Sequence, residues 1–116
     1  MKWAYKNRLS FDERKKEADR IMNRFPDKVP VIVERMSNSR LPGLERQKFL
    51  ASKQLMFEAF RQVIASQIAL HKEETIFFFV EDTIAPSGLT MGKLYEQLKD
   101  KDGFLYMAYK EEATFG

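Results

Sequence analysis

The chain has 116 residues, of which 44% are hydrophobic and 32% are charged. This length and composition fit one globular domain with a hydrophobic core and argue against global disorder. The absence of cysteine and the presence of a single histidine, His71, exclude disulfides, thiolate catalysis and cysteine-bound zinc. No nucleotide-binding or nucleophile motif occurs, so we expect no enzymatic activity, no cofactor and no metal.

The charge balance is mildly basic, with 20 lysines and arginines against 17 acidic residues and a net charge of +3. This excess is too small to indicate nucleic acid by itself, and we expect no nucleic-acid partner. No apolar run approaches the roughly 20 residues that a membrane-spanning helix needs. The first residues also lack the apolar core of a signal peptide. The sequence therefore predicts a cytoplasmic protein.

The first predicted element is a short helix around Trp3 and Tyr5. Ser10 and Glu13 follow with the spacing of a capping box, which predicts a longer helix that begins after Ser10 and ends before Pro26. One face of this helix is expected to carry its apolar residues, which are Phe11, Ala18, Ile21, Met22 and Phe25.

Residues 29–33 (VPVIV) are almost wholly apolar and predict a central strand that is buried on both faces. Pro30 lacks an N–H group and should lie near the start of that strand. Residues 37–43 have the composition of a loop, and residues 48–51 predict a short edge strand. Apolar residues at helical spacing from Met56 to Ile68 then predict a second amphipathic helix, which would begin at Ser52 or Gln54 and end at Leu70.

Residues 76–80 (IFFFV) predict a strand, and residues 82–88 predict a turn. Thr90 can cap a helix over residues 91–98, and residues 100–103 (DKDG) have turn composition. Residues 104–109 predict the last strand. This order of elements indicates an α+β protein in which helices pack on one small mixed sheet.

Five stretches, residues 11–17, 24–32, 48–50, 76–80 and 99–106, match one family in order and spacing, as does the closing Phe-Gly pair. Together they resemble the autophagy ubiquitin-like modifiers, the GABARAP-type proteins that are conjugated to phosphatidylethanolamine. The resemblance implies a ubiquitin-like β-grasp fold, a four-stranded mixed sheet with packed helices, preceded by two N-terminal helices. It implies a single domain over residues 1–116, with a helical subdomain at 1–25 and a flexible conjugation tail at 111–116.

The resemblance also implies a role for Gly116, the last residue. Its carboxylate would be adenylated, passed to enzyme thioesters and joined to the amine of the lipid headgroup. The preceding residue, Phe115, would be recognised by these enzymes. The implied partners are activating and conjugating enzymes, a processing cysteine protease and phosphatidylethanolamine membranes, with autophagosomal localisation after lipidation.

A second implied site binds autophagy receptors and adaptors through short peptides with an aromatic residue, two spacers and an aliphatic residue. The peptide would add a strand beside residues 48–50. The implied aromatic pocket consists of Glu17, Ile21, Pro30, Ile32, Lys48, Leu50 and Phe104. The implied aliphatic pocket consists of Phe49, Ala51, Leu55, Phe60 and Val63. Lys28 and Arg46, with Lys48, would attract acidic residues that flank the motif.

Core packing is the alternative for several of these residues, and we favour it for Ile32 and Phe60, whereas Phe104 and Lys48 are expected to be exposed. Another stretch, Phe77, Phe78 and Phe79, matches a further docking surface in some family members, although here we favour a core strand.

The sequence departs from the family over residues 51–58, where Ser52 could cap an earlier helix start, and at Gln67, where a basic residue is common. Two other functions remain open: an unconjugated adaptor that uses only the groove, and a basic protein associated with RNA or tubulin.

Overall fold

The computed structural model describes residues 1–68 and 75–112. Within these residues the chain forms four helices and five strands in the order α1 (Ala4–Arg8), α2 (Phe11–Arg24), β1 (Lys28–Arg35), β2 (Lys48–Ser52), α3 (Phe57–Gln67), β3 (Ile76–Val80), β4 (Thr83–Ile84), α4 (Met91–Leu98) and β5 (Leu105–Glu111). The strands form one mixed sheet in the order β2-β1-β5-β3-β4. Strands β1 and β5 are parallel at its centre, and the other neighbours are antiparallel.

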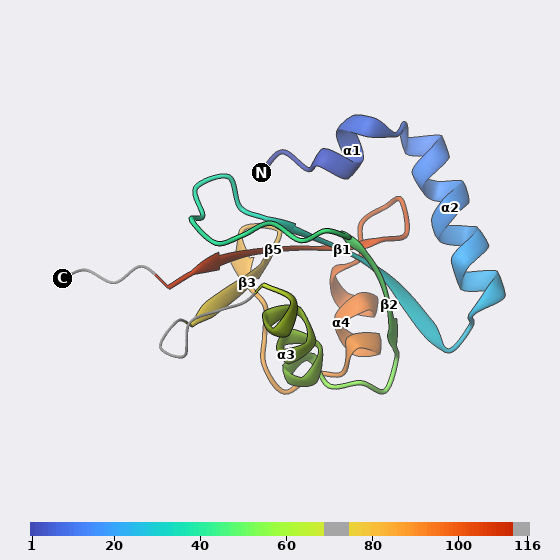
Figure 1. Ribbon diagram of the computed structural model, residues 1–116. Helices are drawn as coiled ribbons and strands as arrows, with labels where there is room; N and C mark the ends of the chain where they lie inside the picture. Colours follow the sequence, from blue (N-terminus) through green and yellow to red (C-terminus); the bar gives the residue numbers. More distant parts are fainter. Residues whose placement is uncertain (69–74, 113–116) are drawn as a thin grey trace.

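Helices cover both faces of this sheet (Figure 1): α1 and α2 lie on one face, and α3 and α4 on the other. The continuous apolar sequence of β1 follows from this arrangement. Val31 and Val33 belong to the core cluster under α3 and α4, and Ile32 belongs to the cluster under α1 and α2. Successive side chains of a strand point to opposite faces, so a strand between two helical layers must be apolar throughout. The predicted central strand is confirmed.

Helix α2 has the predicted capping box: Ser10 Oγ accepts from the Glu13 N–H, and the Glu13 carboxylate accepts from the Ser10 N–H. The helix ends at Arg24, with Phe25 as its C-cap before Pro26. Phe11, which was expected on the buried face, is 45% exposed.

The predicted start of α3 at Ser52 or Gln54 is wrong, because the helix begins at Phe57. The residues before it are held in a turn and an extended segment by backbone hydrogen bonds to other elements. The Lys53 carbonyl accepts from the Gly92 N–H, and the Leu55 carbonyl accepts from the Met91 N–H. These contacts with the start of α4 override the local helical pattern. The predicted end at Leu70 lies outside the described residues.

The sheet has one strand more than the four that were expected. The chain reverses at Glu81 and Asp82, which both have positive φ (51° and 66°), and β4 then pairs with the end of β3. Two consecutive residues with positive φ form the tight turn that matches the twist of a β-hairpin. β4 is only two residues long and carries no apolar alternation, so it was not predicted.

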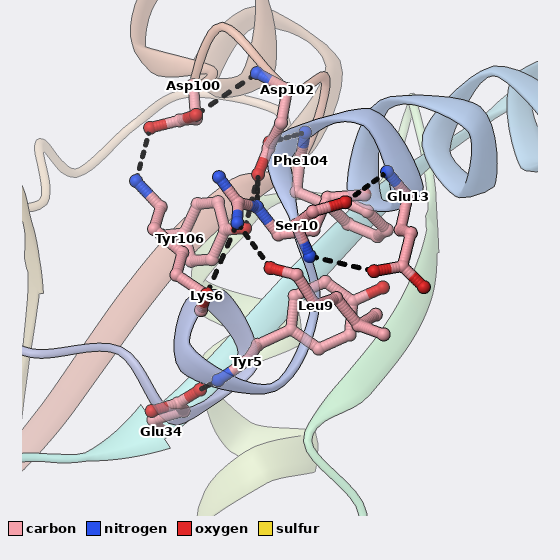
Figure 2. Close-up of polar contacts among 11 residues, drawn as sticks. Tyr5, Lys6, Leu9, Ser10, Glu13, Glu34, Asp100, Asp102, Phe104 and Tyr106 are labelled. Atoms are coloured by element: carbon pink, nitrogen blue, oxygen red, sulfur yellow. Dashed lines mark hydrogen bonds and ion pairs between the residues drawn. The ribbon is translucent and has the colours of Figure 1, made fainter.

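A buried polar cluster joins the N-terminal helices to the sheet (Figure 2). Asp102 accepts from the guanidinium of Arg14 at 2.8 Å and also from the Tyr106 hydroxyl and the Phe104 N–H. The Glu34 carboxylate accepts from the first N–H groups of α1, those of Ala4 and Tyr5. These contacts fix α1 and α2 against β1 and β5.

Candidate peptide-binding site

Strand β2 forms one edge of the sheet, so among the described residues it has a strand partner, β1, on one side only. Its residues alternate between exposed (Lys48, Leu50, Ser52) and buried (Phe49, Ala51). An edge strand with unpaired backbone N–H and C=O groups can accept an extended peptide as a further strand.

A groove of about 460 Å³ lies between this edge and helix α2. Its lining comes from one face of α2 with the following Phe25, and from the first part of β2 with the preceding Arg46: Glu17, Arg20, Ile21, Arg24, Phe25, Arg46, Lys48, Phe49 and Leu50. The α2 members at 17, 20, 21 and 24 have the i, i+3, i+4, i+7 spacing of one helical face. Apolar side chains form part of the lining, and four basic residues lie around them.

One acidic residue, Glu17, lies among these bases. Its carboxylate accepts from Arg20 Nη2 at 2.7 Å on the same helix and from Lys48 Nζ at 3.0 Å on β2. The hydrogen bond from Arg20, followed by that from Lys48, lowers the pKa of Glu17. Glu17 is therefore ionised at neutral pH and pairs with Lys48 in this structure.

Only part of the implied aromatic pocket lines the groove. Glu17, Ile21, Lys48 and Leu50 line the groove together, with Leu50 40% exposed. The other three members, Pro30, Ile32 and Phe104, are buried and do not line it.

The expected exposure of Phe104 is wrong, since its side chain is 0% exposed. It packs edge-to-face on Tyr5, with 5.1 Å between ring centroids, beneath the N-terminal helices. Core packing of Ile32 is confirmed in the same cluster. Phe104 and Ile32 therefore support the groove from the core.

The implied aliphatic pocket lies where β2 meets α3. Phe49 and Phe60 pack edge-to-face at 6.0 Å, and both are buried with Ala51, which confirms core packing for Phe60. Leu55 is half-buried and Val63 is 46% exposed. Of the five residues only Leu55 and Val63 present apolar surface, so the set does not form one deep pocket. Ser52 does not cap α3, whose N-cap is Met56.

The implied electrostatic residues lie at different places. Arg46 is exposed, lines the groove, and has its guanidinium 5.6 Å from the centroid of the Phe49 ring. Lys28 is half-buried at the start of β1 and does not line the groove. Arg20 and Arg24 do line it, although they were missing from the expected set. Their spacing from Glu17 is the sequence signal that could have identified them.

The three phenylalanines of β3 point in two directions. Phe78 is buried in the core, as favoured from the sequence, and packs on Phe57 and Tyr109. Phe77 and Phe79 are half-buried on the opposite face and contact each other edge-to-face. The stretch is a core strand with a partly exposed outer side.

Gly116, Phe115 and His71 lie outside the described residues. Across residues 1–68 and 75–112, no group of three or more potential metal-ligating side chains occurs. No helix in the part of the chain that the structure describes is long and apolar enough to cross a membrane.

A mixed five-stranded sheet between helical layers, with two helices at the N-terminus, defines a ubiquitin-like protein. The family model for "Autophagy protein Atg8 ubiquitin like" matches residues 13–116. The chain therefore belongs to the Atg8 family, whose members are non-enzymatic ubiquitin-like modifiers of autophagy.

Two solved structures are similar to this chain over essentially their whole length. Trypanosoma brucei ATG8 is 38% identical, with a TM-score of 0.91 and 100% of each chain covered. Plasmodium falciparum Atg8, solved in complex with a Plasmodium falciparum Atg3 peptide, is 33% identical, with a TM-score of 0.87, 98% of this chain covered and 100% of that chain. These matches confirm the ubiquitin-like fold that the sequence resemblance implied.

Proposed function

We propose that this autophagy protein is joined through Gly116 to phosphatidylethanolamine on autophagosomal membranes, where its groove recruits receptors and cargo. The supporting observation is the groove between α2 and the free edge of β2, in a chain of the Atg8 family. Its residues fit an extended peptide with an aromatic residue, two spacers and an aliphatic residue.

In this proposal the peptide pairs with the backbone of β2, and its aromatic side chain enters the groove beside Ile21 and Leu50. The aliphatic side chain contacts the apolar surface that Leu55 and Val63 leave exposed. Two anchors of roughly 1.5–3 kcal/mol each, with the strand pairing and after the cost of ordering the peptide, correspond to low-micromolar affinity, about −8 kcal/mol. The bases of the groove favour acidic residues beside the motif.

The conjugation chemistry needs a last residue without a side chain, so that enzyme nucleophiles reach its carbonyl carbon. ATP would convert the Gly116 carboxylate to an acyl adenylate with release of pyrophosphate. An enzyme thiolate would then displace AMP, and the lipid amine would finally displace the thiolate to leave an amide. The product carries two acyl chains, each methylene contributing about 0.8 kcal/mol, which suffices for stable anchoring where one chain does not.

The partners follow from the same chemistry: an activating enzyme, a conjugating enzyme and, for precursors with further residues, a cysteine protease. A relative, the Plasmodium falciparum Atg8, binds an Atg3 peptide. We extend this to a peptide segment of the conjugating enzyme as one ligand of this chain. The alternative function is an unconjugated adaptor that uses only the groove.

Reconstitution with the activating and conjugating enzymes, ATP and liposomes containing phosphatidylethanolamine separates these functions. We expect a lipid-dependent electrophoretic shift for the wild type and none for Gly116→Ala, at the same unfolding temperature. A wild-type chain that gives no shift, while a family relative does, would disprove conjugation and favour the adaptor function.

The groove is tested separately by NMR titration with a Trp-x-x-Leu peptide bearing acidic flanks. We expect the amide signals of residues 48–50 to move. Unmoved signals there would disprove the peptide site, whatever the result for the lipid.

A further inference from the structure

The end of β5 is held by a side-chain contact that neither the groove nor the core explains. The Glu111 carboxylate accepts from Ser39 Oγ at 2.6 Å and from the Arg40 N–H at 3.1 and 3.2 Å through its two oxygens. Ser39 Oγ in turn accepts from the Leu41 N–H at 3.1 Å. The contact therefore joins the last residue of β5 to the loop after β1.

This contact lies where β5 loses one of its two neighbouring strands. Strand β5 has β1 beside it as far as Tyr109, which pairs with Arg35, and the Met36 N–H then donates to the Tyr109 carbonyl. Beyond that point β1 has ended. β3 still pairs with Glu111 through Ile76 on the other side.

The Glu112 N–H donates to the Thr75 carbonyl at 2.9 Å, so β3 and the residue before it hold one side of the chain to its last described residue. The Glu111 carboxylate restrains the other side of the chain, where β1 no longer pairs with β5. Ser39 is buried and the Glu111 side chain is 12% exposed, so the hydrogen bond between them is partly shielded from water, whereas those from the Arg40 N–H are exposed. The ion pair of Glu111 with Arg40 adds little, since Arg40 Nε is 3.7 Å away and the Arg40 side chain is 86% exposed.

Covalent geometry ties this anchored point to the proposed conjugation site. Gly116 follows Glu112 by four residues, and an extended chain spans at most about 3.6 Å per residue, so the two α-carbons are separated by no more than about 14 Å. The direction in which the chain leaves β5 therefore determines which region the Gly116 carbonyl can reach.

We propose that Ser39 and Glu111 are positioning residues for conjugation: their hydrogen bond fixes the direction in which the chain leaves β5 and so presents the Gly116 carboxylate to the activating enzyme. This inference rests on the proposed function. The folded domain docks on the enzyme in the same way without the contact, but the carboxylate spends less time in the reactive position. The loss should therefore appear in kcat for thioester formation, with KM little changed.

The test measures kcat and KM for thioester formation with the activating enzyme and ATP, for wild type, Ser39→Ala and Ser39→Thr. Misplacing a reacting group by about 1 Å can cost roughly 100-fold. Glu111 lies five residues before Gly116 and does not touch the reacting carbonyl itself, so we expect a smaller loss: a three- to tenfold lower kcat for Ser39→Ala, with KM within a factor of two. Ser39→Thr keeps the hydroxyl and should recover most of the rate.

A matched control separates positioning from stability. Ser10→Ala removes a serine hydroxyl that also accepts a backbone hydrogen bond, at the far N-cap of α2, so it should destabilise the fold without lowering kcat. Amide relaxation by ¹⁵N NMR supplies a readout independent of the enzymes. We expect increased fast motion at Glu111 and Glu112 in Ser39→Ala only.

Three results would overturn the inference: an unchanged kcat for Ser39→Ala, an equal loss of kcat for Ser10→Ala, or unchanged relaxation at Glu111 in Ser39→Ala. A wild-type chain that forms no thioester would overturn the proposed conjugation itself, and this inference with it. Failure of the positioning role alone is distinguishable, because the wild type then conjugates normally.

Discussion

Lys48 Nζ lies 3.0 Å from Glu17 Oε1, and this ion pair links edge strand β2 to helix α2 across the candidate groove. Hollows lie on both sides of it: the groove of about 460 Å³ and a second one of about 720 Å³ that reaches Tyr5 and Arg8. Glu17, Arg46 and Lys48 line both. In the proposed peptide complex, an acidic peptide residue would replace Glu17 as the partner of Lys48.

Lys48→Ala should therefore separate peptide affinity from fold stability. Both side chains of the pair are partly exposed, and such pairs contribute at most about 1 kcal/mol to folding. We expect an unfolding free energy within about 1 kcal/mol of wild type. A peptide with an acidic flank should bind roughly three- to tenfold more weakly, and one with a neutral flank should be nearly unaffected.

Calorimetric titration at low and high salt measures this difference, which should shrink as salt screens the charges. Lys15→Ala is the control, because Lys15 pairs with Asp19 on α2 and lines neither hollow. An equal loss for both peptides would show that Lys48 contributes packing rather than charge.

In contrast to Lys48→Ala, breaking the buried Arg14–Asp102 pair should lower the free energy of unfolding strongly. Asp102 is 0% exposed and accepts from Arg14, Tyr106 and Phe104. Asp102→Ala leaves the guanidinium without its carboxylate partner, which typically costs about 3–5 kcal/mol. Denaturant unfolding would measure the loss. Asp19→Ala, at an exposed pair, should change stability by less than about 0.5 kcal/mol.

Stability at acid pH should depend on Glu111. The hydrogen bond from Ser39, together with that from Arg40, lowers the pKa of Glu111 to about 2 from an ordinary value of 4.5. A carboxyl group with a depressed folded-state pKa stabilises the fold above its unfolded pKa, and this contribution is lost as the pH falls toward the folded value. We therefore expect the wild type to lose the stabilisation from this group as the pH falls from roughly 5 toward 2.

Glu111→Gln provides the comparison, since it keeps an oxygen acceptor and cannot titrate. Denaturant unfolding across this pH range should show a gap between wild type and Glu111→Gln that closes as the pH falls. A gap that stays constant down to pH 2 would contradict the hydrogen-bonded arrangement.

Local chemistry made much of the fold predictable from sequence. Ser10 with Glu13, and Thr90 with the Lys93 N–H, cap the helices that were expected to follow them. Apolar runs identified β1, β3 and β5. The start of α3 could not be predicted, because the hydrogen bonds that displace it come from Met91 and Gly92, more than 30 residues further along the chain.

The candidate site could likewise be predicted only in part from the sequence. Glu17, Ile21 and Leu50 were expected there because of the family resemblance, and all three line the groove in the structure. Phe104 was expected at the surface because it follows a glycine turn. Gly103 has φ of +95°, and a Cβ there would lie 2.9 Å from the Ala18 Cβ, so the turn passes against α2. A residue next to a turn is usually exposed, but Phe104 is buried because α2 packs over this turn, which the local sequence does not reveal.

Leu50 and Phe104 offer the sharpest contrast between groove and core. Leu50 is 40% exposed and lines the groove, so Leu50→Ala should change the free energy of unfolding by less than about 1 kcal/mol. Its loss should weaken the binding of a Trp-x-x-Leu peptide roughly tenfold, because the aromatic side chain of the peptide loses apolar contact area.

Phe104 is fully buried against Tyr5 and Tyr106, and Phe104→Ala should cost about 3–5 kcal/mol of stability. Denaturant unfolding and peptide titration of both variants, below the unfolding transition, test this division. A Phe104→Ala protein of unchanged stability that no longer binds peptide would make Phe104 a direct groove contact after all.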